Sequence, residues 1–532
     1  MIIDFEKEDP SEALLTPDIC IIGAGIAGLV MAREFLKMNH RVTVLESGGL
    51  QFEEATQALY DAQNVGAPYL GALMGRFRVF GGSSTRWGAQ LLPFNVEDFQ
   101  DREWIQDSKW PFGMAELAPY YLRALPIMGT NVLPHEGELL SPFRPGKQFQ
   151  LNPEIFKVRY SKFAPLGRRN LGKTLYQDLK KSTHIQLLLH ANVVEIGMNL
   201  SGTKAEKVSL KTLSGKSADV HPTVLIVASG TLETTRILLA SNRVSPKGIG
   251  NQNDLVGRYL QDHVSCRGAT LIPKNVMQFE NTVSSFFVKG TRHFPRFELT
   301  HPAQNKNNLL NVFGHIGFNY PADSAVNTLR EWIRALQRKE CPNVTWSKIY
   351  AIFKEMGYIL RVAYRILSKK RYPFMKNAIF HLQVDTEQAP NPDSRLTLSN
   401  ENDRLGIPKL QIHWALTPKE HASIQWFVKT FQQEWKNLDL GEIQINPKLL
   451  GTQEEWLENL TDAYHPAGTT RMHLDPSAGV VDENLKIHGV SNLYIASCSV
   501  FPASAGANPT YTLMALAIRL SDHLKQKLHH AL

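Results

Sequence analysis

The chain has 532 residues, which is enough for two domains with sizeable hydrophobic cores. Its composition is that of an ordinary globular protein, with 43% hydrophobic and 20% charged residues. The net charge of +8 is uneven, because residues 330–376 contain twelve Lys and Arg but only three Glu, and so account for the whole positive excess. The basic charge therefore does not imply nucleic-acid binding by the protein as a whole.

The N-terminal residues and the spacing of the cysteines predict a cytoplasmic protein. The opening residues MIIDFEKEDP lack the basic start and the apolar core of a signal peptide. Residues 489–518 carry no charge, but Pro502, Gly506 and Pro509 interrupt them, so we predict a buried strand, loop and helix rather than a transmembrane segment. The four cysteines are far apart and have no CxxC spacing, which argues against a metal site or a disulfide framework and favours a reducing compartment.

The N-terminal region contains the pattern of a dinucleotide-binding unit. A predicted buried strand at Ile19–Ile22 is followed by a helix at 29–38 and a second strand at Val42–Leu45. The turn and the end of this unit carry the residues of the βαβ fingerprint, which are Gly23, Gly25, Gly28 and Glu46. The fingerprint predicts a dinucleotide cofactor, although it does not separate FAD from NAD.

Each fingerprint residue has a physical role. Gly23 permits the tight turn, Gly25 lets the backbone approach a pyrophosphate, and Gly28 lets the helix pack closely on the strand. The N-terminus of the helix offers free N–H groups and the positive end of its dipole to the phosphates. Glu46 is placed to bind the two hydroxyls of an adenosine ribose, and it disfavours NADP because it would repel a 2′-phosphate.

A second glycine-rich loop follows at residues 75–88. Gly81 and Gly82 are adjacent and are followed by the small hydroxyl residues Ser83 and Ser84. Such a backbone can press against a flat or charged ligand, and the same pattern also suits a plain surface turn.

The middle of the chain continues the first sheet and then changes in character. We predict a helix at 171–181, strands at 185–196 and 224–228, and a helix at 231–240 that repeats the strand–glycine–helix pattern. His263 stands alone in this pattern and is interpreted as a structural histidine. From about Cys266 onward, alternating segments predict an antiparallel sheet in a second domain, followed by a long helix at 417–438.

The basic stretch interrupts this second domain with helical patterning at 328–338 and 346–367. Charged helices of this kind are usually solvated surface helices, which is the favoured interpretation. The alternative is a docking face for an acidic partner or a membrane surface.

The C-terminal region is the second most informative part of the sequence. His465 lies in the segment YHPAGTTRM, and a predicted strand at 493–496 leads to ANPT at residues 507–510. A helix is expected at 511–527 with Thr510 as its N-cap, which would place a second positive dipole end near an anionic group.

Taken together, these motifs resemble those of the glucose–methanol–choline (GMC) oxidoreductase family, which binds FAD. The resemblance covers nearly the whole chain and rests on the glycine fingerprint with Glu46 and on residues 81–84, 110–111, 119–121, 256–258, 391–395, 465–469 and 507–510. The sugar-oxidising branches, such as pyranose oxidase, look closer than the cholesterol-oxidising ones.

The resemblance implies roles for individual residues. His465 matches the active-site histidine, and Asn508 matches the second catalytic position. The implied cofactor-binding residues are Gly23, Gly25, Gly28, Glu46, Gly81, Gly82, Ser83, Ser84, Val193, Ser497, Asn508 and Thr510, with the backbone of Val193 holding the adenine. Ser497 departs from the aspartate of many relatives, and Arg86 replaces the histidine that bonds to the flavin in pyranose oxidase, so non-covalent FAD is expected.

The resemblance also implies an α/β fold, in which a Rossmann-like FAD-binding domain joins a substrate domain built on an antiparallel sheet flanked by helices. The FAD-binding domain is expected to comprise residues 1–92, 155–262 and 460–532. The substrate domain is expected to comprise 93–154 and 263–459, with a basic helical insertion at 322–376.

We therefore predict an FAD-dependent enzyme that oxidises a CH–OH group of a small-molecule sugar, glycoside or polyol. His465 accepts the hydroxyl proton, and Asn508 orients the hydroxyl or the oxyanion. The alternatives are a lyase related to hydroxynitrile lyases, an NAD-dependent dehydrogenase, a dehydrogenase subunit that passes electrons to a redox partner, and a non-enzymatic binding protein. The sequence leaves the electron acceptor open between oxygen, a quinone and a redox protein.

Overall fold

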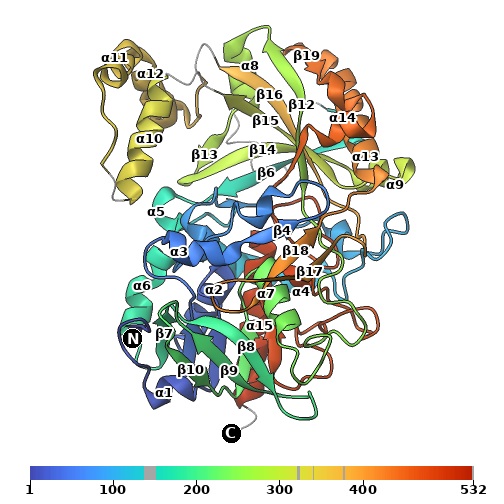
Figure 1. Ribbon diagram of the computed structural model, residues 1–532. Coiled ribbons are helices and arrows are strands. Elements are labelled where there is room, and N and C mark those ends of the chain that lie inside the picture. Colours follow the sequence, from blue (N-terminus) through green and yellow to red (C-terminus); the bar gives the residue numbers. More distant parts are fainter. Residues whose placement is uncertain (137–150, 320–323, 339–340, 375–377, 530–532) are drawn as a thin grey trace.

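The computed structural model describes the chain except for residues 137–150, 320–323, 339–340, 375–377 and 530–532. A parallel sheet occupies the lower half of Figure 1 and a large antiparallel sheet the upper half. The parallel sheet has the strand order β1 (Ile2–Asp4), β7 (Ile185–Leu189), β3 (Val42–Leu45), β2 (Ile19–Ile22), β11 (Val224–Val227) and β21 (Leu493–Ile495). Strands β2, β3 and β11 are buried along their whole length, as continuous apolar runs in a sheet covered on both faces require.

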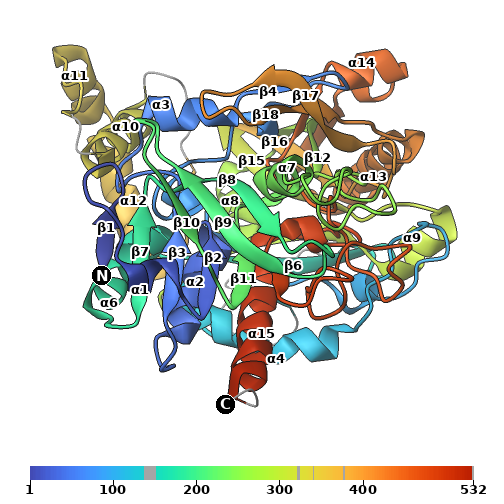
Figure 2. The same cartoon turned by 60° about the horizontal axis from the view of Figure 1, so that its bottom comes forward.

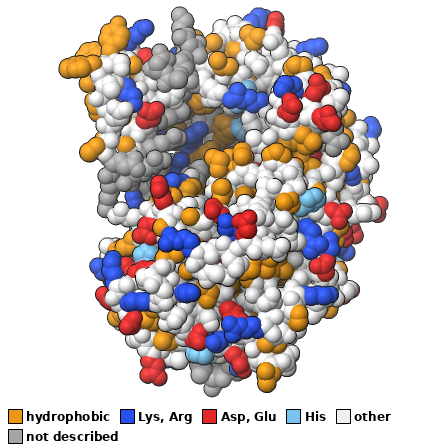
Figure 3. All heavy atoms as spheres, viewed as in Figure 1, with side chains coloured by type: hydrophobic (Ala, Val, Ile, Leu, Met, Phe, Trp, Pro, Cys, Tyr) orange, Lys and Arg blue, Asp and Glu red, His pale blue; other side chains and the backbone are white. Residues whose placement is uncertain are grey.

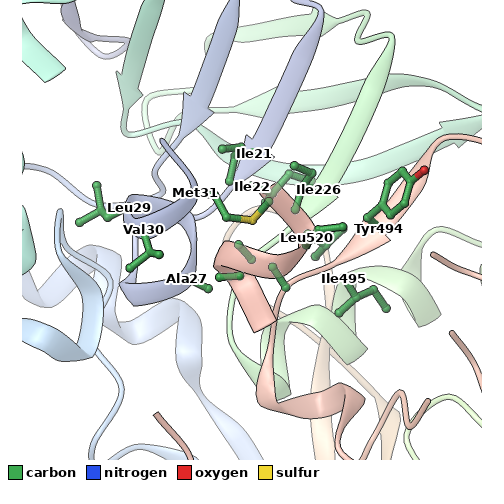
Figure 4. Packing of buried hydrophobic residues seen from close by; sticks show 14 of the residues in the cluster. Ile21, Ile22, Ala27, Leu29, Val30, Met31, Ile226, Tyr494, Ile495 and Leu520 are labelled. Carbon is green, nitrogen blue, oxygen red and sulfur yellow. The ribbon is translucent and has the colours of Figure 1, made fainter. Parts of the chain in front are cut away.

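Helices from both ends of the chain cover this sheet. They are α2 (Ile26–Phe35), α6 (Leu171–Lys181) and α15 (Thr510–His529). Helix α4 (Met114–Ile127) packs on α15, and α7 (Thr231–Ala240) follows β11 and packs on strands outside this sheet. Figure 4 shows Ala27 and Met31 of α2 in one core with Ile226 of β11 and Leu520 of α15. The first and last segments of the chain are therefore packed together around the glycine turn.

A predicted strand at 185–196 is divided in the structure. Strand β7 ends at Leu189, His190 adopts a positive φ of 56°, and the chain turns into β8 (Asn192–Met198). Strand β8 belongs to a separate ribbon with β9 (Ala205–Lys211) and β10 (Ser217–Val220). The prediction of a single strand was wrong because periodicity does not reveal one residue in the left-handed region.

The large sheet runs in the order β19 (Gly441–Ile445), β12 (Val264–Pro273), β16 (Ile379–Thr386), β15 (Val312–Asn319), β14 (Thr291–Leu299), β6 (Phe156–Phe163) and β5 (Gln90–Leu91), with β13 (Phe286–Val288) on β14 and β20 (Leu460–Asp462) on β12. All of these pairings are antiparallel, as the alternating pattern predicts. Helix α13 (Pro418–Asn437) packs on one face, where Phe297 meets Phe431. Arg296, the neighbour of Phe297, points to the opposite face because side chains alternate along a strand.

The basic stretch forms helices α10 (Ala325–Arg338), α11 (Trp346–Lys354) and α12 (Met356–Lys369). They stand out from the body at the upper left of Figures 1 and 2. Glu355 ends α11 and precedes α12, so the helix predicted at 346–367 is two helices.

The remaining elements connect these parts. They are α1 (Glu12–Leu15), α3 (Glu54–Gln57), α5 (Leu166–Arg169), α8 (Val276–Val283), α9 (His301–Asn307), α14 (Gln453–Leu457) and a small sheet of β4 (Ala62–Asn64), β18 (Pro408–His413) and β17 (Arg395–Asn402). Within the described residues, none of the helices combines the length and the apolar character needed to cross a bilayer.

Candidate active site

The glycine turn between β2 and α2 is shaped by three close approaches. Gly23 has φ +104°, and a Cβ atom there would lie 2.7 Å from the Ala228 carbonyl oxygen. A Cβ on Gly28 would lie 1.9 Å from the Gly23 carbonyl oxygen, so only glycine lets α2 pack this closely on the turn. The Cβ position of Gly25 instead faces open space, with nothing within 4 Å, which leaves room for a ligand against the backbone.

Glu46 lies at the end of β3, beside this turn. Its Oε2 accepts a hydrogen bond of 2.9 Å from the N–H of Ala24, and its Oε1 accepts one of 2.9 Å from the N–H of Gly48. The side chain is 5% exposed, and burial raises the pKa of its carboxyl above the usual value. Oε1 also accepts from the Ser47 hydroxyl at 3.4 Å, whereas Oε2 keeps a second lone pair, so Glu46 is held in place and can still accept from a ligand hydroxyl.

A cavity of about 450 Å³ opens at the turn, within the size range of small-molecule sites. Its wall brings together most of the residues singled out in the sequence, namely Gly23, Gly25, Glu46, Gly82, Ser83, Val193, His465, Ser497 and Thr510. The first turns of α2, α7 and α15 also reach this wall, so their free N–H groups and positive dipole ends favour an anionic ligand.

Gly81 and Ser84 fasten the second glycine loop. The N–H of Gly81 donates to the carbonyl oxygen of Ala24 at 3.0 Å, which ties the loop to the first glycine turn. The Ser84 hydroxyl donates to the Gly81 carbonyl oxygen and accepts from the N–H of Leu171 at 3.1 Å. Gly82 and Ser83 are thereby presented to the cavity.

His465 and Asn508 come together although they are 43 residues apart in sequence. Asn508 Nδ2 lies 3.3 Å from His465 Nε2. His465 follows β20, and Asn508 lies just before α15, so the loops at the ends of these two elements build the pair. His465 lines the cavity, and Asn508 also contacts Arg296 of the large sheet.

His263 contacts the other side of the His465 ring. The two Nδ1 atoms are 2.9 Å apart, and His263 Nε2 lies 2.8 Å from the Ala505 carbonyl oxygen. A carbonyl oxygen can only accept, so His263 Nε2 carries a hydrogen and its Nδ1 is bare when the ring is neutral. His465 Nδ1 must then carry a hydrogen, which leaves the lone pair on His465 Nε2.

Both imidazoles are held neutral. Burial lowers the pKa of His263 to about 4. Burial is also the main cause that lowers the pKa of His465 well below its usual value, with His263 and Arg296 adding to it. The hydrogen bonds and the burial of the two rings therefore favour the same protonation state, in which His465 Nε2 is unprotonated and faces the cavity.

Arg296 fixes the opposite end of the chain of hydrogen bonds. Its Nη1 donates to Asn508 Oδ1 at 2.6 Å, which turns the Asn508 amide nitrogen toward His465. The guanidinium carbon lies 3.6 Å from the Phe313 ring centroid, and the residue is 2% exposed. Burial lowers the pKa of Arg296 to about 10, and within the described residues its Nε has no hydrogen-bond partner.

Asp262 binds the backbone N–H groups of both His465 and His263. Its carboxylate accepts from the N–H of His465 at 2.9 Å and from the N–H of His263 at 2.7 Å. The Tyr69 hydroxyl donates to it at 2.7 Å. Burial, with the charge of Asp462 as the second cause, raises the pKa of Asp262 to about 8. Asp262 therefore acts on the position of His465 rather than on the proton of its ring.

Asp262, His263 and Arg296 were not identified as site residues from the sequence. His263 was interpreted as structural, but it hydrogen-bonds directly to the His465 ring. For Arg296, the only signal was a charged residue within the strand sequence TRHFPRFEL, and no motif marks it.

The comparisons with known proteins point to the same family as the sequence motifs. Residues 390–517 match the sequence profile of the GMC oxidoreductase family. The chain is 24% identical to 6'''-hydroxyparomomycin C oxidase of Streptomyces lividus, over 96% of this chain and 92% of that protein. It is 22% identical to the fructose dehydrogenase large subunit of Gluconobacter japonicus, over 96% and 98%.

Residues 390–517 thus carry the GMC oxidoreductase profile that the sequence motifs predicted, and the similarity to sugar-oxidising relatives extends over nearly the whole chain. A solved structure of an FAD-dependent oxidoreductase from Chaetomium thermophilum shares the fold, with a TM-score of 0.61 and 16% identity over 96% of this chain and 100% of that one. The predicted fold class is confirmed. The profile match and the flavin oxidases among the similar solved structures imply FAD as the cofactor.

The residues present fit that cofactor. The space over Gly25 and the adjacent helix N-termini suit a pyrophosphate, and the fixed carboxylate of Glu46 suits a ribose. Ser497 lines the cavity, and its hydroxyl accepts from the N–H of Ser499 at 3.2 Å. Arg86 also lines the cavity and stacks over Phe52 and Phe77, 4.5 and 4.8 Å from their ring centroids.

Proposed function

We propose that this protein oxidises a CH–OH group of a sugar, glycoside or polyol to a carbonyl. The observation that carries the proposal is the hydrogen-bond chain that leaves the lone pair on His465 Nε2, at the cavity wall and beside the Asn508 amide. FAD, when bound, supplies the acceptor for the hydride. His465 takes the hydroxyl proton at Nε2, and Asn508 donates to the substrate oxygen as negative charge develops on it.

The polar face of the large sheet supports a substrate with several hydroxyls. Arg296, His315 and Gln383 follow one another across β14, β15 and β16 on the face opposite α13. Asp385 and Ser265 form a second row on the same face, where the Ser265 hydroxyl donates to Asp385 and accepts from Gln383 Nε2 at 2.8 Å. Donors and acceptors at this density match a polyhydroxylated ligand better than an apolar alcohol.

The names of two relatives agree with this substrate class, since one is an oxidase of an aminoglycoside and the other a fructose dehydrogenase subunit. The lyase alternative is not favoured. The electron acceptor, whether oxygen, a quinone or a redox protein, is a separate property of the enzyme.

We further propose that FAD is bound non-covalently. The position that carries the attachment histidine in pyranose oxidase is Arg86, whose guanidinium forms no flavin bond. The proposed contacts are Gly23, Gly25, Glu46, Gly82, Ser83, Val193, Ser497, Asn508 and Thr510, with Gly28, Gly81 and Ser84 shaping the backbone. Precipitation of the protein with acid should release all of the yellow flavin into the supernatant.

We also propose the division into an FAD-binding part, residues 1–92, 155–262 and 460–532, and a substrate-binding part, residues 93–154 and 263–459. The parallel sheet falls within the first part. Strands β5, β6 and β20 of that part pair with the large sheet, so the chain crosses between the two parts at these strands. A cytoplasmic location is proposed because Cys20 and Cys266 are buried free thiols.

Anaerobic flavin bleaching tests the function. The purified yellow enzyme is mixed without oxygen with a panel of sugars, glycosides, polyols and simple alcohols, and the flavin absorbance is followed. We expect bleaching by members of the first three groups and formation of a carbonyl product. A flavin that stays yellow with every alcohol while the substrate is cleaved would identify a lyase. Adding oxygen, a quinone or ferricyanide to the reduced enzyme then ranks the acceptors.

A further inference from the structure

The projecting helices α11 and α12 expose apolar side chains at helical spacing. On α11, Trp346, Tyr350 and Phe353 are 86%, 70% and 74% exposed. They occupy positions i, i+4 and i+7 and therefore lie on one face. The apolar stripe of an amphipathic helix normally faces a core, but this stripe faces solvent, as the hydrophobic side chains at the upper left of Figure 3 show.

Helix α12 repeats the arrangement. Leu360, Tyr364 and Leu367 again occupy positions i, i+4 and i+7, and each is more than half exposed. Among the residues of α11 that the structure describes, none is buried. Two successive helices thus carry outward apolar stripes, which distinguishes them from the single exposed hydrophobic residues common on protein surfaces.

The orientation of α12 is fixed by its basic side chains. Arg365 and Arg361 form ion pairs of 2.7 and 3.1 Å with Glu280 of α8, whose carboxylate is fully buried. The N–H of Phe374, which follows the end of α12, donates to the same carboxylate at 2.9 Å. Because the polar side is anchored to the body, rotating the stripe inward would leave the Glu280 charge buried without its partners.

The charge of the segment identifies the kind of surface that can cover these stripes. Residues 330–376 carry a sequence charge of +9, whereas the rest of the chain is close to neutral. A two-fold contact between copies would bring the same basic segment against itself, which is unfavourable. An anionic surface is attracted instead, and Trp and Tyr beside Lys and Arg are the residues that settle at a lipid headgroup layer.

We propose that α11 and α12 dock this enzyme on the surface of a bilayer containing anionic phospholipids. Trp346, Tyr350 and Phe353 enter the headgroup region, and the exposed side chains of Lys354 and Lys370 meet the lipid phosphates. The helices lie along the surface, because α11 and α12 span 9 and 14 residues, too few to cross the hydrocarbon layer. The docking is independent of the proposed catalytic function.

Vesicle flotation of the full-length, flavin-loaded enzyme tests the proposal. The probes are vesicles of phosphatidylcholine alone and of phosphatidylcholine mixed with phosphatidylglycerol. We expect binding to the anionic vesicles, weakened by salt, and a blue shift of tryptophan fluorescence that is lost in Trp346→Phe. In the triple variant Trp346→Ser, Tyr350→Ser and Phe353→Ser, the affinity for anionic vesicles should fall by roughly tenfold or more.

The matched control replaces exposed apolar residues of the body, Val132→Ser, Leu166→Ser and Leu200→Ser, which are 66%, 64% and 100% exposed. This control should float like the unchanged enzyme, and both triple variants should keep flavin content and turnover with a water-soluble acceptor. Absence of flotation with anionic vesicles overturns the proposal. An equal loss of vesicle binding in the control variant also overturns it. So does an enzyme that binds no vesicles but forms a dimer, which the α11 triple variant converts to monomers.

Discussion

The Nδ1 atoms of His465 and His263 lie 2.9 Å apart, with His263 anchored through Nε2 to the Ala505 carbonyl oxygen. This contact determines which nitrogen of His465 is basic. From the other end, Arg296 can only donate, so it orients the Asn508 amide in the sense that the histidine pair requires. Two independent anchors therefore specify one arrangement of protons at the cavity.

Replacement of His465 should slow the chemical step and spare the cofactor. In His465→Ala we expect the rate of anaerobic flavin reduction to fall by about 10²- to 10⁴-fold, the usual contribution of a positioned base. The flavin absorbance of the purified variant should stay unchanged, since Gly25 and Glu46 do not depend on this side chain. Stopped-flow measurement of flavin bleaching checks this, and bleaching at the normal rate would remove His465 from the mechanism.

His263 is expected to act as a positioning residue. His263→Leu removes the acceptor for His465 Nδ1–H, so the ring is free to adopt the other tautomer, and we expect flavin reduction to slow roughly tenfold or more. His263→Asn offers a carbonyl oxygen close to the former Nδ1 and should recover part of the rate. Equal rates in the two variants would indicate a packing role instead.

The pH dependence should reflect the depressed pKa of His465. Burial favours the neutral ring, so the base is competent well below its ordinary pKa of 6.5, and kcat/KM for reduction should stay flat down to pH 6.5 and fall only below it. The stability of the folded protein should also decrease as the pH falls. A depressed folded-state pKa gives stability that is present above 6.5 and is lost as the pH falls through about 4, the value for His263. An acid limb centred above 6.5 would contradict this assignment.

Local patterns in the sequence predicted the dinucleotide unit well. Strands β2 and β3 have the predicted bounds, because buried apolar runs between glycines leave little choice. Helix α2 begins at Ile26, three residues before the expected start, since Gly25 already serves as its N-cap. The roles of Gly23 and Gly28 also follow from the backbone alone and need no tertiary information.

The rest of the site depends on contacts between distant segments. His263 and His465 are 202 residues apart, and Arg296 meets Asn508 only because of the register of the large sheet. Neither contact leaves a periodic signal. The stripes on α11 and α12 show the same limit, since helical spacing predicts an apolar face but cannot say whether a core or solvent lies against it.

Arg296 should matter through its charge and its geometry. Arg296→Met releases the Asn508 amide and removes the only positive charge described at the catalytic pair, so we expect kcat to fall by roughly 10- to 100-fold with little change in flavin content. Arg296→Lys keeps the positive charge but loses the fixed geometry of the guanidinium. Its kcat should lie between those of the unchanged enzyme and Arg296→Met. Steady-state kinetics with the best substrate checks the order, and full activity in Arg296→Met would leave the residue with a structural role.

Gly28 provides a test of the cofactor turn that is separate from catalysis. In Gly28→Ala the new methyl group would start 1.9 Å from the Gly23 carbonyl oxygen, so α2 must move away from the turn that carries Gly25. We expect a loss of about 1–3 kcal/mol in unfolding free energy, as for other overpacked sites, together with a low flavin content. Gly167→Ala is the matched control, because nothing lies within 4 Å of its Cβ position in helix α5. Denaturant melts and the flavin-to-protein absorbance ratio check both variants. If Gly28→Ala melted like the control and kept its flavin, the close packing of α2 on the glycine turn would not be what holds the cofactor site together.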